Sequence, residues 1–245
     1  MNVLDVVYGL AILFAVLFVG SFIQGLTGFG AGIIAMGFIS LVVPLKTGTL
    51  LVLAVTVVMC LGILARNREH IKIGEIKLLL ASALVSRAAA FFVMDAFGGE
   101  EAMKRVLGAT LILMVALLWR GRVAGAGHGA ATVSVGFFGG FIGGLFAVGG
   151  PIYALYFLHR YKDKREYMAN LQLTFLLANL LTLGAHGFNG DIGFDFVPAF
   201  LIGAAASWLG VRSGMLFFGK APDGFIRKAA FLIVLFGGLH LMVFP

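Results

Sequence analysis

A single arginine lies deep within a long apolar stretch of the sequence, where a permanent charge is costly. Arg87 stands near the middle of residues 74–97, about 15–20 Å along a helix from either end. No Asp or Glu lies well inside any apolar stretch, so the sequence offers Arg87 no buried carboxylate partner. A guanidinium group suits planar or tetrahedral oxyanions, which it binds through two parallel hydrogen bonds. Arg87 is therefore a candidate binding group for a small anion.

Two glycine-rich stretches share one pattern and predict further anion-binding groups. GSFIQGLTGFGAGIIAMGF at residues 20–38 and GGFIGGLFAVGGPIYALYF at residues 139–157 agree at nine of nineteen aligned positions. So many glycines disfavour a continuous helix, at about 1 kcal/mol each relative to alanine. Pro151, which follows Gly149 and Gly150, suits the first turn of a new helix. Each stretch thus predicts a helix that stops, opens its backbone and restarts, with free N–H groups facing the break.

The same glycines have a purely structural alternative. Small residues four apart let membrane helices pack closely, and Gly140 with Gly144 fits that spacing. The short run after the second cluster argues for a break, because residues 151–159 span only about 13 Å as a helix. Non-helical backbone at membrane depth is tolerated where it is buried in protein or lines a watery cavity. We therefore favour breaks that line a binding site.

Uncharged polar residues are candidates to complete this site. Gln24 and Thr27 lie in the first glycine-rich stretch, and Tyr153 follows the second. Gln172 and Asn179 are seven apart and share one face of a later helix. These side chains either donate hydrogen bonds to a substrate or bind neighbouring helices, and both interpretations stay open. The residues expected to bind the substrate are Gln24, Thr27, Gly28, Phe29, Gly30, Arg87, Gly149, Gly150, Pro151, Tyr153, Gln172 and Asn179.

The composition indicates which elements must position these residues. The chain has 245 residues, of which 61% are hydrophobic and 12% charged, and its mean hydropathy is +1.06. Runs of about 20 apolar residues recur along the chain and predict an all-α polytopic membrane protein. The net charge of +7 lies in short connections between spans, so it does not indicate nucleic-acid binding. The single cysteine, Cys60, excludes an internal disulfide.

Ten segments are predicted to be helical, five in each half of the chain. They are residues 4–24, 30–43, 47–65, 74–97, 101–119, 132–146, 151–159, 166–186, 194–217 and 225–244. Basic residues of the connections are expected in the cytoplasm, namely Arg66, Arg68, Lys72, Arg120, Arg122, Arg160, Lys162, Lys164, Arg165, Lys220, Arg227 and Lys228. Lys46 and the acidic connection around Asp191 are expected outside.

An odd number of segments per half reverses the orientation of the second half. The chain is therefore expected to be an inverted repeat of residues 1–122 and 123–245 within one membrane domain. Each half is expected to contain a glycine-broken re-entrant or short helix pair plus three transmembrane helices. The first break then enters from outside and the second from inside.

The paired motifs resemble those of a known transporter family. GLTGFGAG at residues 25–32 and GGLFAVGGP at residues 143–151 are similar to the motifs of the sulfite exporter TauE/SafE family, also called the 4-toluene sulfonate uptake permease family. The resemblance covers essentially the whole chain, including its length and duplication. It implies transport of small sulfur-containing anions such as sulfite, sulfoacetate, other organosulfonates or thiosulfate.

Residues and resemblance together predict a secondary transporter of a small sulfur-containing oxyanion in the cell inner membrane. It is expected not to be an enzyme and to need no metal or other cofactor. The expected partners are the anion and the lipid bilayer, with a homodimer as one option and no nucleic acid. The alternatives are an anion channel with the same site, a permease for a non-sulfur anion, a hydrolase built on Ser86 or Ser207, and a non-transporting assembly subunit.

Overall fold

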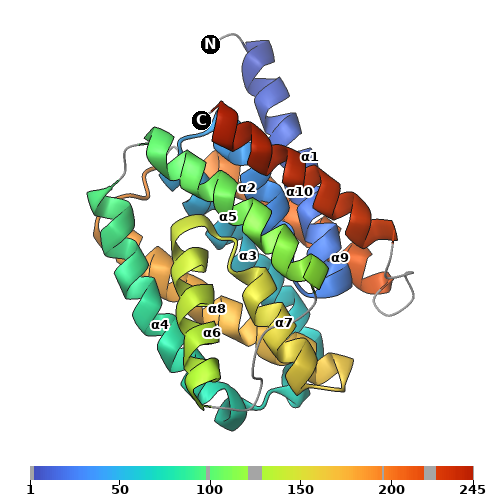
Figure 1. Ribbon diagram of the computed structural model, residues 1–245. Coiled ribbons are helices and arrows are strands. Elements are labelled where there is room, and N and C mark those ends of the chain that lie inside the picture. Colours follow the sequence, from blue (N-terminus) through green and yellow to red (C-terminus); the bar gives the residue numbers. More distant parts are fainter. Residues whose placement is uncertain (1–2, 98–99, 121–128, 195, 218–224, 245) are drawn as a thin grey trace.

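The computed structural model describes residues 3–97, 100–120, 129–194, 196–217 and 225–244, and these residues are almost entirely helical (Figure 1). They form ten α-helices and one short 3-10 helix, with no strand among them. The elements are α1 (Val3–Thr27), α2 (Ala31–Val42), α3 (Leu45–Asn67), η1 (Arg68–His70), α4 (Ile73–Ala96), α5 (Glu100–Arg120), α6 (Gly129–Phe146), α7 (Gly150–Arg160), α8 (Lys164–Phe188), α9 (Phe196–Leu216) and α10 (Phe225–Val243).

Each of the ten predicted spans corresponds to one of these helices, so the all-α fold is confirmed. The observed ends differ from the predicted ends by at most three residues. Seven of the described helices are long and apolar enough to cross a membrane. The helices α2 and α7, with 12 and 11 residues, are the predicted half-helices. The predicted cytoplasmic residues Arg122 and Lys220 lie outside the described residues.

Two closely packed helix pairs join the first half of the chain to the second. Helix α1 packs along α9, and α4 packs along α6 (Figure 1). A Cβ on Gly214 of α9 would lie 2.1 Å from the carbonyl oxygen of Phe22, and one on Gly140 of α6 would lie 2.5 Å from that of Ala83. Close packing through small residues, including Gly140, therefore occurs in these pairs, in addition to the breaks described below.

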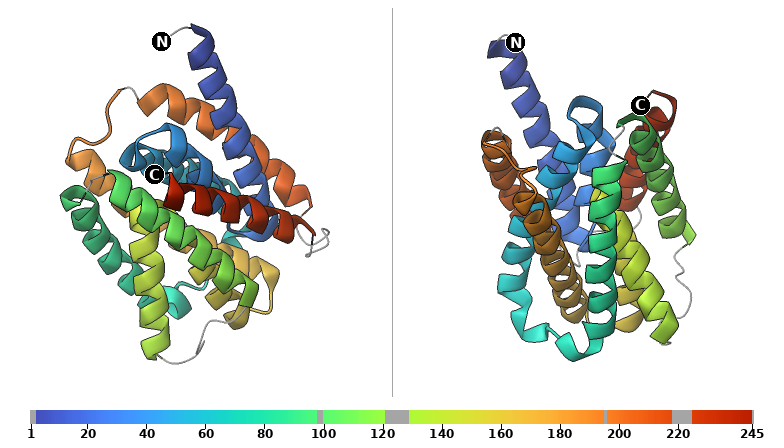
Figure 2. Two further views of the ribbon diagram at one scale, coloured as in Figure 1. Left: turned by 45° about the horizontal axis from the view of Figure 1, so that its top comes forward. Right: turned by 90° about the vertical axis from the view of Figure 1, so that its left-hand side faces the viewer.

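Helices α3 and α8 cross as an antiparallel pair. Lys46 at the start of α3 pairs with Asp191 just beyond the end of α8. Lys72, beyond the end of α3, pairs with Glu166 in the first turn of α8. We call these two ends of the protein the Lys46 end and the Lys72 end. They are at the top and the bottom of the right-hand view in Figure 2.

Contacts between the halves follow the alignment of the sequence repeat. The hydroxyl of Ser21 on α1 donates to that of Ser207 on α9 at 2.8 Å. In the repeat, Gly140 aligns with Ser21, and Ser86 aligns with Ser207 when residues 86–98 are laid over residues 207–219. A Cβ on Gly140 would lie 2.1 Å from Ser86 Oγ. Aligned positions thus meet in both pairs. The inverted orientation across a membrane stays a prediction, as does the boundary after residue 122, which lies in the undescribed segment 121–128.

Gly214 provides a test of this packing. Gly214→Ala places a methyl group 2.1 Å from the carbonyl oxygen of Phe22, so α1 and α9 must move apart. Overpacking of this kind costs about 1–3 kcal/mol, and we expect a lower melting temperature in detergent. Gly62→Ala is the matched control, because nothing lies within 4 Å of its Cβ position and alanine favours the helix. A Gly214→Ala protein as stable as the wild type contradicts the close packing.

Candidate functional site

Both glycine-rich stretches break their helices, and the two breaks meet. The first break lies between α1 and α2 at residues 28–30, and the second lies between α6 and α7 at residues 147–149. A Cβ on Gly32, in the first turn of α2, would lie only 1.9 Å from the carbonyl oxygen of Ala147. The backbones of the two halves therefore touch here, and position 32 has no room for a larger residue.

The backbone follows a similar course at aligned positions of the two breaks. Gly28 and the aligned Ala147 both have positive φ angles, of 91° and 58°, a geometry that costs an alanine more than a glycine. The helices α2 and α7 then begin at aligned residues, directly after Gly30 and Gly149. Because both N-cap residues are glycines, neither supplies a side-chain cap to the first N–H groups. Two uncapped helix starts thus lie close together.

The half-helices leave this meeting point in opposite directions (Figure 2). Helix α2 leads to the Lys46 end, whereas α7 ends at Arg160, which lies 3.5 Å from Glu75 at the Lys72 end. The N-terminus of each helix carries the positive end of its dipole. Both positive ends therefore converge on the breaks.

Side chains of α8 hold the first break. The Nε2 of Gln172 donates to the carbonyl oxygen of Gly28 at 2.6 Å, and its Oε1 accepts from Gln24 Nε2 at 3.3 Å. The hydroxyl of Tyr167 donates to the carbonyl oxygen of Thr27 at 2.9 Å. Carbonyl groups freed at membrane depth need such partners. In this structure Gln172, a predicted substrate donor, bonds the backbone of the break.

Arg87 lies beside the second break and is only 3% exposed. Its Nη1 donates to Thr182 Oγ1 at 3.2 Å, and its Nη2 donates to Asn179 Oδ1 at 3.0 Å. Its Nε has no hydrogen-bond partner. A Cβ on Gly143 would lie 2.7 Å from Nη2, so this glycine of α6 leaves room for the guanidinium. Within the described part of the chain, Arg87 has neutral hydrogen-bond partners and no ion pair.

The second half has no equivalent of this charge. The position aligned with Arg87 is Trp208, which is half exposed, and the Arg212 guanidinium lies 5.2 Å from its ring centre. The site is therefore asymmetric even though the breaks are alike.

A small cavity of about 30 Å³ lies between the breaks and Arg87. We call it the central cavity. Its volume is only about twice the minimum that accommodates one water molecule. Its lining residues are Gln24, Gly30, Gly32, Ile33, Leu53, Thr56, Arg87, Ala147, Gly149, Gly150, Tyr153, Phe175 and Asn179.

Seven of the twelve predicted site residues line the central cavity. These are Gln24, Gly30, Arg87, Gly149, Gly150, Tyr153 and Asn179. The other five shape the breaks. The Thr27 hydroxyl bonds the carbonyl oxygen of Phe29, Gly28 bonds Gln172, and Pro151 is buried in the first turn of α7. Binding of a substrate by these residues stays a prediction.

Six lining residues are not among the twelve expected binding residues, although one of them, Gly32, belongs to the first glycine-rich stretch. They are Gly32, Ile33, Leu53, Thr56, Ala147 and Phe175. Thr56 carried a usable signal, because it is a polar residue within the long apolar run of α3, although its hydroxyl bonds the Val52 carbonyl oxygen at 2.7 Å. Ile33, Leu53 and Phe175 resemble any other apolar residue of a membrane helix and carried none.

A second cavity, of about 410 Å³, lies on the other side of Arg87. It extends toward the Lys46 end, since Asn189 beyond α8 is among its lining residues. The remaining lining residues are Ala88, Phe91, Phe92, Leu181, Thr182, Ala185 and Phe188. Arg87 therefore contributes to two cavities, a small one at the breaks with a mixed polar and apolar lining and a larger, mostly apolar one.

The described residues also include the groups on which metal binding or serine chemistry would depend. No group of three or more His, Cys, Asp or Glu residues among them could hold a metal ion. The hydroxyl of Ser86 donates to the carbonyl oxygen of Ala83, and Ser207 pairs with Ser21. Neither serine is hydrogen-bonded to a histidine, so the arrangement that activates a serine nucleophile is not formed around them.

Gln172 allows a test of how the first break is held. Gln172→Met keeps the volume but leaves the carbonyl oxygen of Gly28 without its 2.6 Å donor. A buried carbonyl that loses its partner costs about 1–3 kcal/mol, so we expect a lower melting temperature in detergent. Thr174→Val is the matched control, since among the described residues the Thr174 hydroxyl bonds only the Asn170 carbonyl oxygen of its own helix. An equal fall in melting temperature in the two variants would contradict the role of Gln172 in holding the first break.

One model of a known protein family matches nearly the whole chain. No curated protein and no solved structure matches the chain significantly. The family model of the sulfite exporter TauE/SafE matches residues 12–241, which include both breaks, Arg87 and the whole of α8. Members of this family are membrane transporters of sulfite and related sulfur anions. Because the match covers nearly the whole chain, the protein belongs to the sulfite exporter TauE/SafE family.

Proposed function

We propose that the protein is a secondary transporter of a small sulfur-containing oxyanion, such as sulfite, sulfoacetate or another organosulfonate, in the cell inner membrane. The anion binds in the central cavity, between the N-termini of α2 and α7 and the guanidinium of Arg87. Family membership supports the class of substrate, and the seven long apolar helices support a multi-pass membrane protein.

The observation that carries this proposal is the buried guanidinium of Arg87, which has no anionic partner among the described residues. The ion pairs of the described chain all lie at the Lys46 end or the Lys72 end. A charge at membrane depth is costly, and neutral acceptors compensate it only in part. An anion from solution supplies the missing opposite charge.

The surroundings of Arg87 suit an oxyanion with several oxygens on one centre. Sulfite and sulfonate groups present three oxygens, and a guanidinium binds two of them in a bidentate manner. The uncapped starts of α2 and α7 offer backbone N–H groups to the remaining oxygen. The central cavity of about 30 Å³ is small for such a group, so binding requires the surrounding helices to separate. Rocking of two halves about a central site provides such a motion.

Two alternatives use the same site. An anion channel would conduct along the gradient without any exchange of bound anions. A permease for a non-sulfur anion would bind acetate or phosphate as well as sulfite. Neither alternative changes the role of Arg87, so both are resolved by transport measurements.

Arg87→Gln tests the proposal in purified protein reconstituted into liposomes. Hydrogen bonds from a charged donor contribute about 1.5–3 kcal/mol, so we expect uptake of labelled sulfite to fall about 10- to 100-fold. Arg87→Lys keeps the charge but loses the planar arrangement of donors. Its sulfite uptake should therefore lie between that of the wild type and that of Arg87→Gln. Arg212→Gln is the matched control, because that guanidinium lies over Trp208, which does not line the central cavity. Gel filtration confirms that each variant is folded.

The transport class is read from the same liposomes. Unlabelled sulfite inside the liposomes should accelerate the entry of labelled sulfite, because a transporter exchanges anions across the membrane. Absence of this counterflow favours a channel. Competition by acetate or phosphate as strong as that by sulfonates favours a non-sulfur permease. Wild-type uptake by the folded Arg87→Gln protein would overturn the proposed site.

A further inference from the structure

The Lys46 end holds a cluster of charged and polar side chains. Lys46 Nζ lies 2.6 Å from Asp191 Oδ1 and 3.4 Å from Asp95 Oδ1. His186 Nδ1 lies 2.6 Å from the other oxygen of Asp191, and Asn189 Nδ2 donates to both acids. The cluster joins the start of α3 to the end of α4 and the end of α8.

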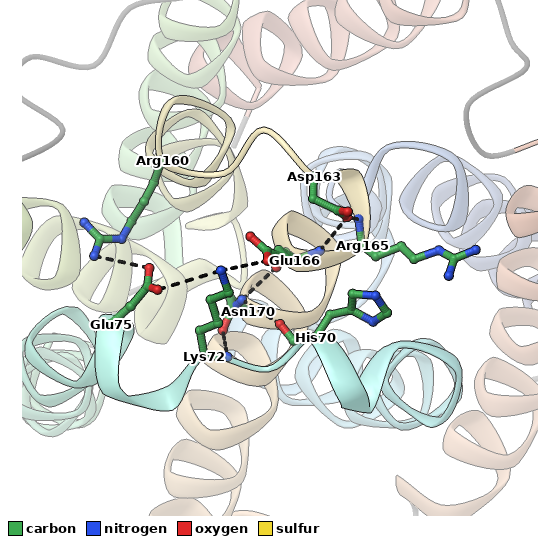
Figure 3. A network of polar contacts seen from close by, with 8 residues as sticks. All are labelled: His70, Lys72, Glu75, Arg160, Asp163, Arg165, Glu166 and Asn170. Atoms are coloured by element: carbon green, nitrogen blue, oxygen red, sulfur yellow. Dashed lines mark hydrogen bonds and ion pairs between the residues drawn. The ribbon is translucent and has the colours of Figure 1, made fainter.

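The Lys72 end holds a second cluster (Figure 3). Lys72 Nζ lies 2.7 Å from Glu166 Oε1 and 3.9 Å from Glu75 Oε1, and Arg160 Nη2 lies 3.5 Å from Glu75 Oε2. The buried Asn170 accepts a hydrogen bond from the backbone N–H of Lys72 at 2.8 Å. This cluster joins the connection after α3 to the start of α8 and the end of α7.

Both clusters join the two helices of the same antiparallel pair, α3 and α8, one cluster at each end of the pair. At each end the lysine belongs to the α3 side and the carboxylate to the α8 side. The central cavity lies between these two clusters. Leu53 and Thr56 of α3 line it, as do Phe175 and Asn179 of α8. Separation of α3 from α8 at one end therefore opens the central cavity toward that end.

We infer that the Lys46–Asp191 and Lys72–Glu166 ion pairs are the two gates of the protein, which open alternately. This inference rests on the proposed function, because only a transporter needs its site to face the two sides in turn. The lysines are 34% and 40% exposed, and their partners are 15% and 25% exposed. Ion pairs in contact with water add little net stability. Such pairs can break and re-form in every cycle, unlike the tight contacts of α1 with α9.

One partner of each pair, Asp191 or Lys72, is held in its charged form at neutral pH. Partial burial opposes ionisation of Asp191, but hydrogen bonds from Lys46, His186 and Asn189 hold its pKa at about 2. The hydrogen bond to Glu166 raises the pKa of Lys72 above its ordinary value. Asp191 and Lys72 are therefore charged under the conditions of a transport measurement.

The test is the side from which a cysteine in the central cavity can be labelled. Thr56→Cys provides the reporter in a Cys60→Ser background, since Cys60 is the single native thiol and is buried. Membrane-impermeant maleimide is applied to vesicles of each orientation. Lys46→Gln is expected to raise the ratio of labelling from the Lys46 side to labelling from the Lys72 side about two- to fivefold. Lys72→Gln is expected to lower this ratio by a similar factor.

Opposite changes of the labelling ratio in Lys46→Gln and Lys72→Gln distinguish gating from a general loosening of the fold. A general loosening raises labelling from both sides. Lys77→Gln is the matched control, because Lys77 is exposed on α4 and forms no ion pair within the described residues. Lys46→Arg and Lys72→Arg should keep the wild-type ratio. Shifts in the same direction, or ratios unchanged in both glutamine variants, overturn the gates.

Labelling needs no substrate, so the labelling ratio tests the gates whereas uptake tests the proposed function. One proposal can therefore be overturned while the other is supported. Opposite shifts in a protein that moves no sulfite or sulfonate overturn the proposed substrate and support the gates. Normal sulfite uptake with unchanged ratios overturns the gates alone.

As a second readout, Lys46→Cys with Asp191→Cys is joined by a cleavable bifunctional thiol reagent. We expect sulfite uptake to stop on joining and to return on cleavage, and uptake that continues while joined overturns this gate.

Discussion

A permanent positive charge held at membrane depth without a carboxylate partner is the constraint on which the rest of this structure depends. An arginine at the centre of a membrane helix costs about 2.5–3.5 kcal/mol or more. Thr182 and Asn179 supply neutral acceptors to Arg87, and Gly143 leaves space for its guanidinium. The uncapped starts of α2 and α7 add more positive potential nearby. The guanidinium and the two helix starts together give this region a positive potential, which is the property that the proposed anion site uses.

Helix α8 supplies most of the hydrogen-bond partners of this polar centre. Along its buried face, Asn170 accepts a hydrogen bond from the backbone N–H of Lys72, in the connection after α3, and Gln172 donates to the first break. Asn179 and Thr182 accept hydrogen bonds from Arg87. His186 then reaches Asp191 beyond the end of the helix. A purely apolar α8 would leave the Gly28 carbonyl group and the guanidinium without partners. The polar residues of α8 are thus a condition for the breaks as well as for the buried charge of Arg87.

The helices and breaks were predictable because their causes are local in the sequence. Apolar runs define the spans, and the two glycine clusters mark the residues where helices stop. The role of each polar residue was not predictable, because it depends on which helix packs opposite. Gln172 and Asn179 share one face of α8, yet Gln172 meets the first break and Asn179 meets Arg87. The lining residues Leu53 and Phe175 were hidden because apolar residues occur throughout the chain.

Arg87 and the two ends of the protein are connected through hydrogen bonds and ion pairs of α4 and α8. The hydrogen bonds of Arg87 to Asn179 and Thr182 tie these helices at mid-length. Asp95 and Asn189 tie them at one end, and Lys72 with Glu166 ties the start of α8 to the residue before α4. A ligand shifts a conformational equilibrium only when it binds one state better than another. An anion that bonds Arg87 competes with the two acceptors on α8, so its binding free energy acts directly on the contact between α4 and α8.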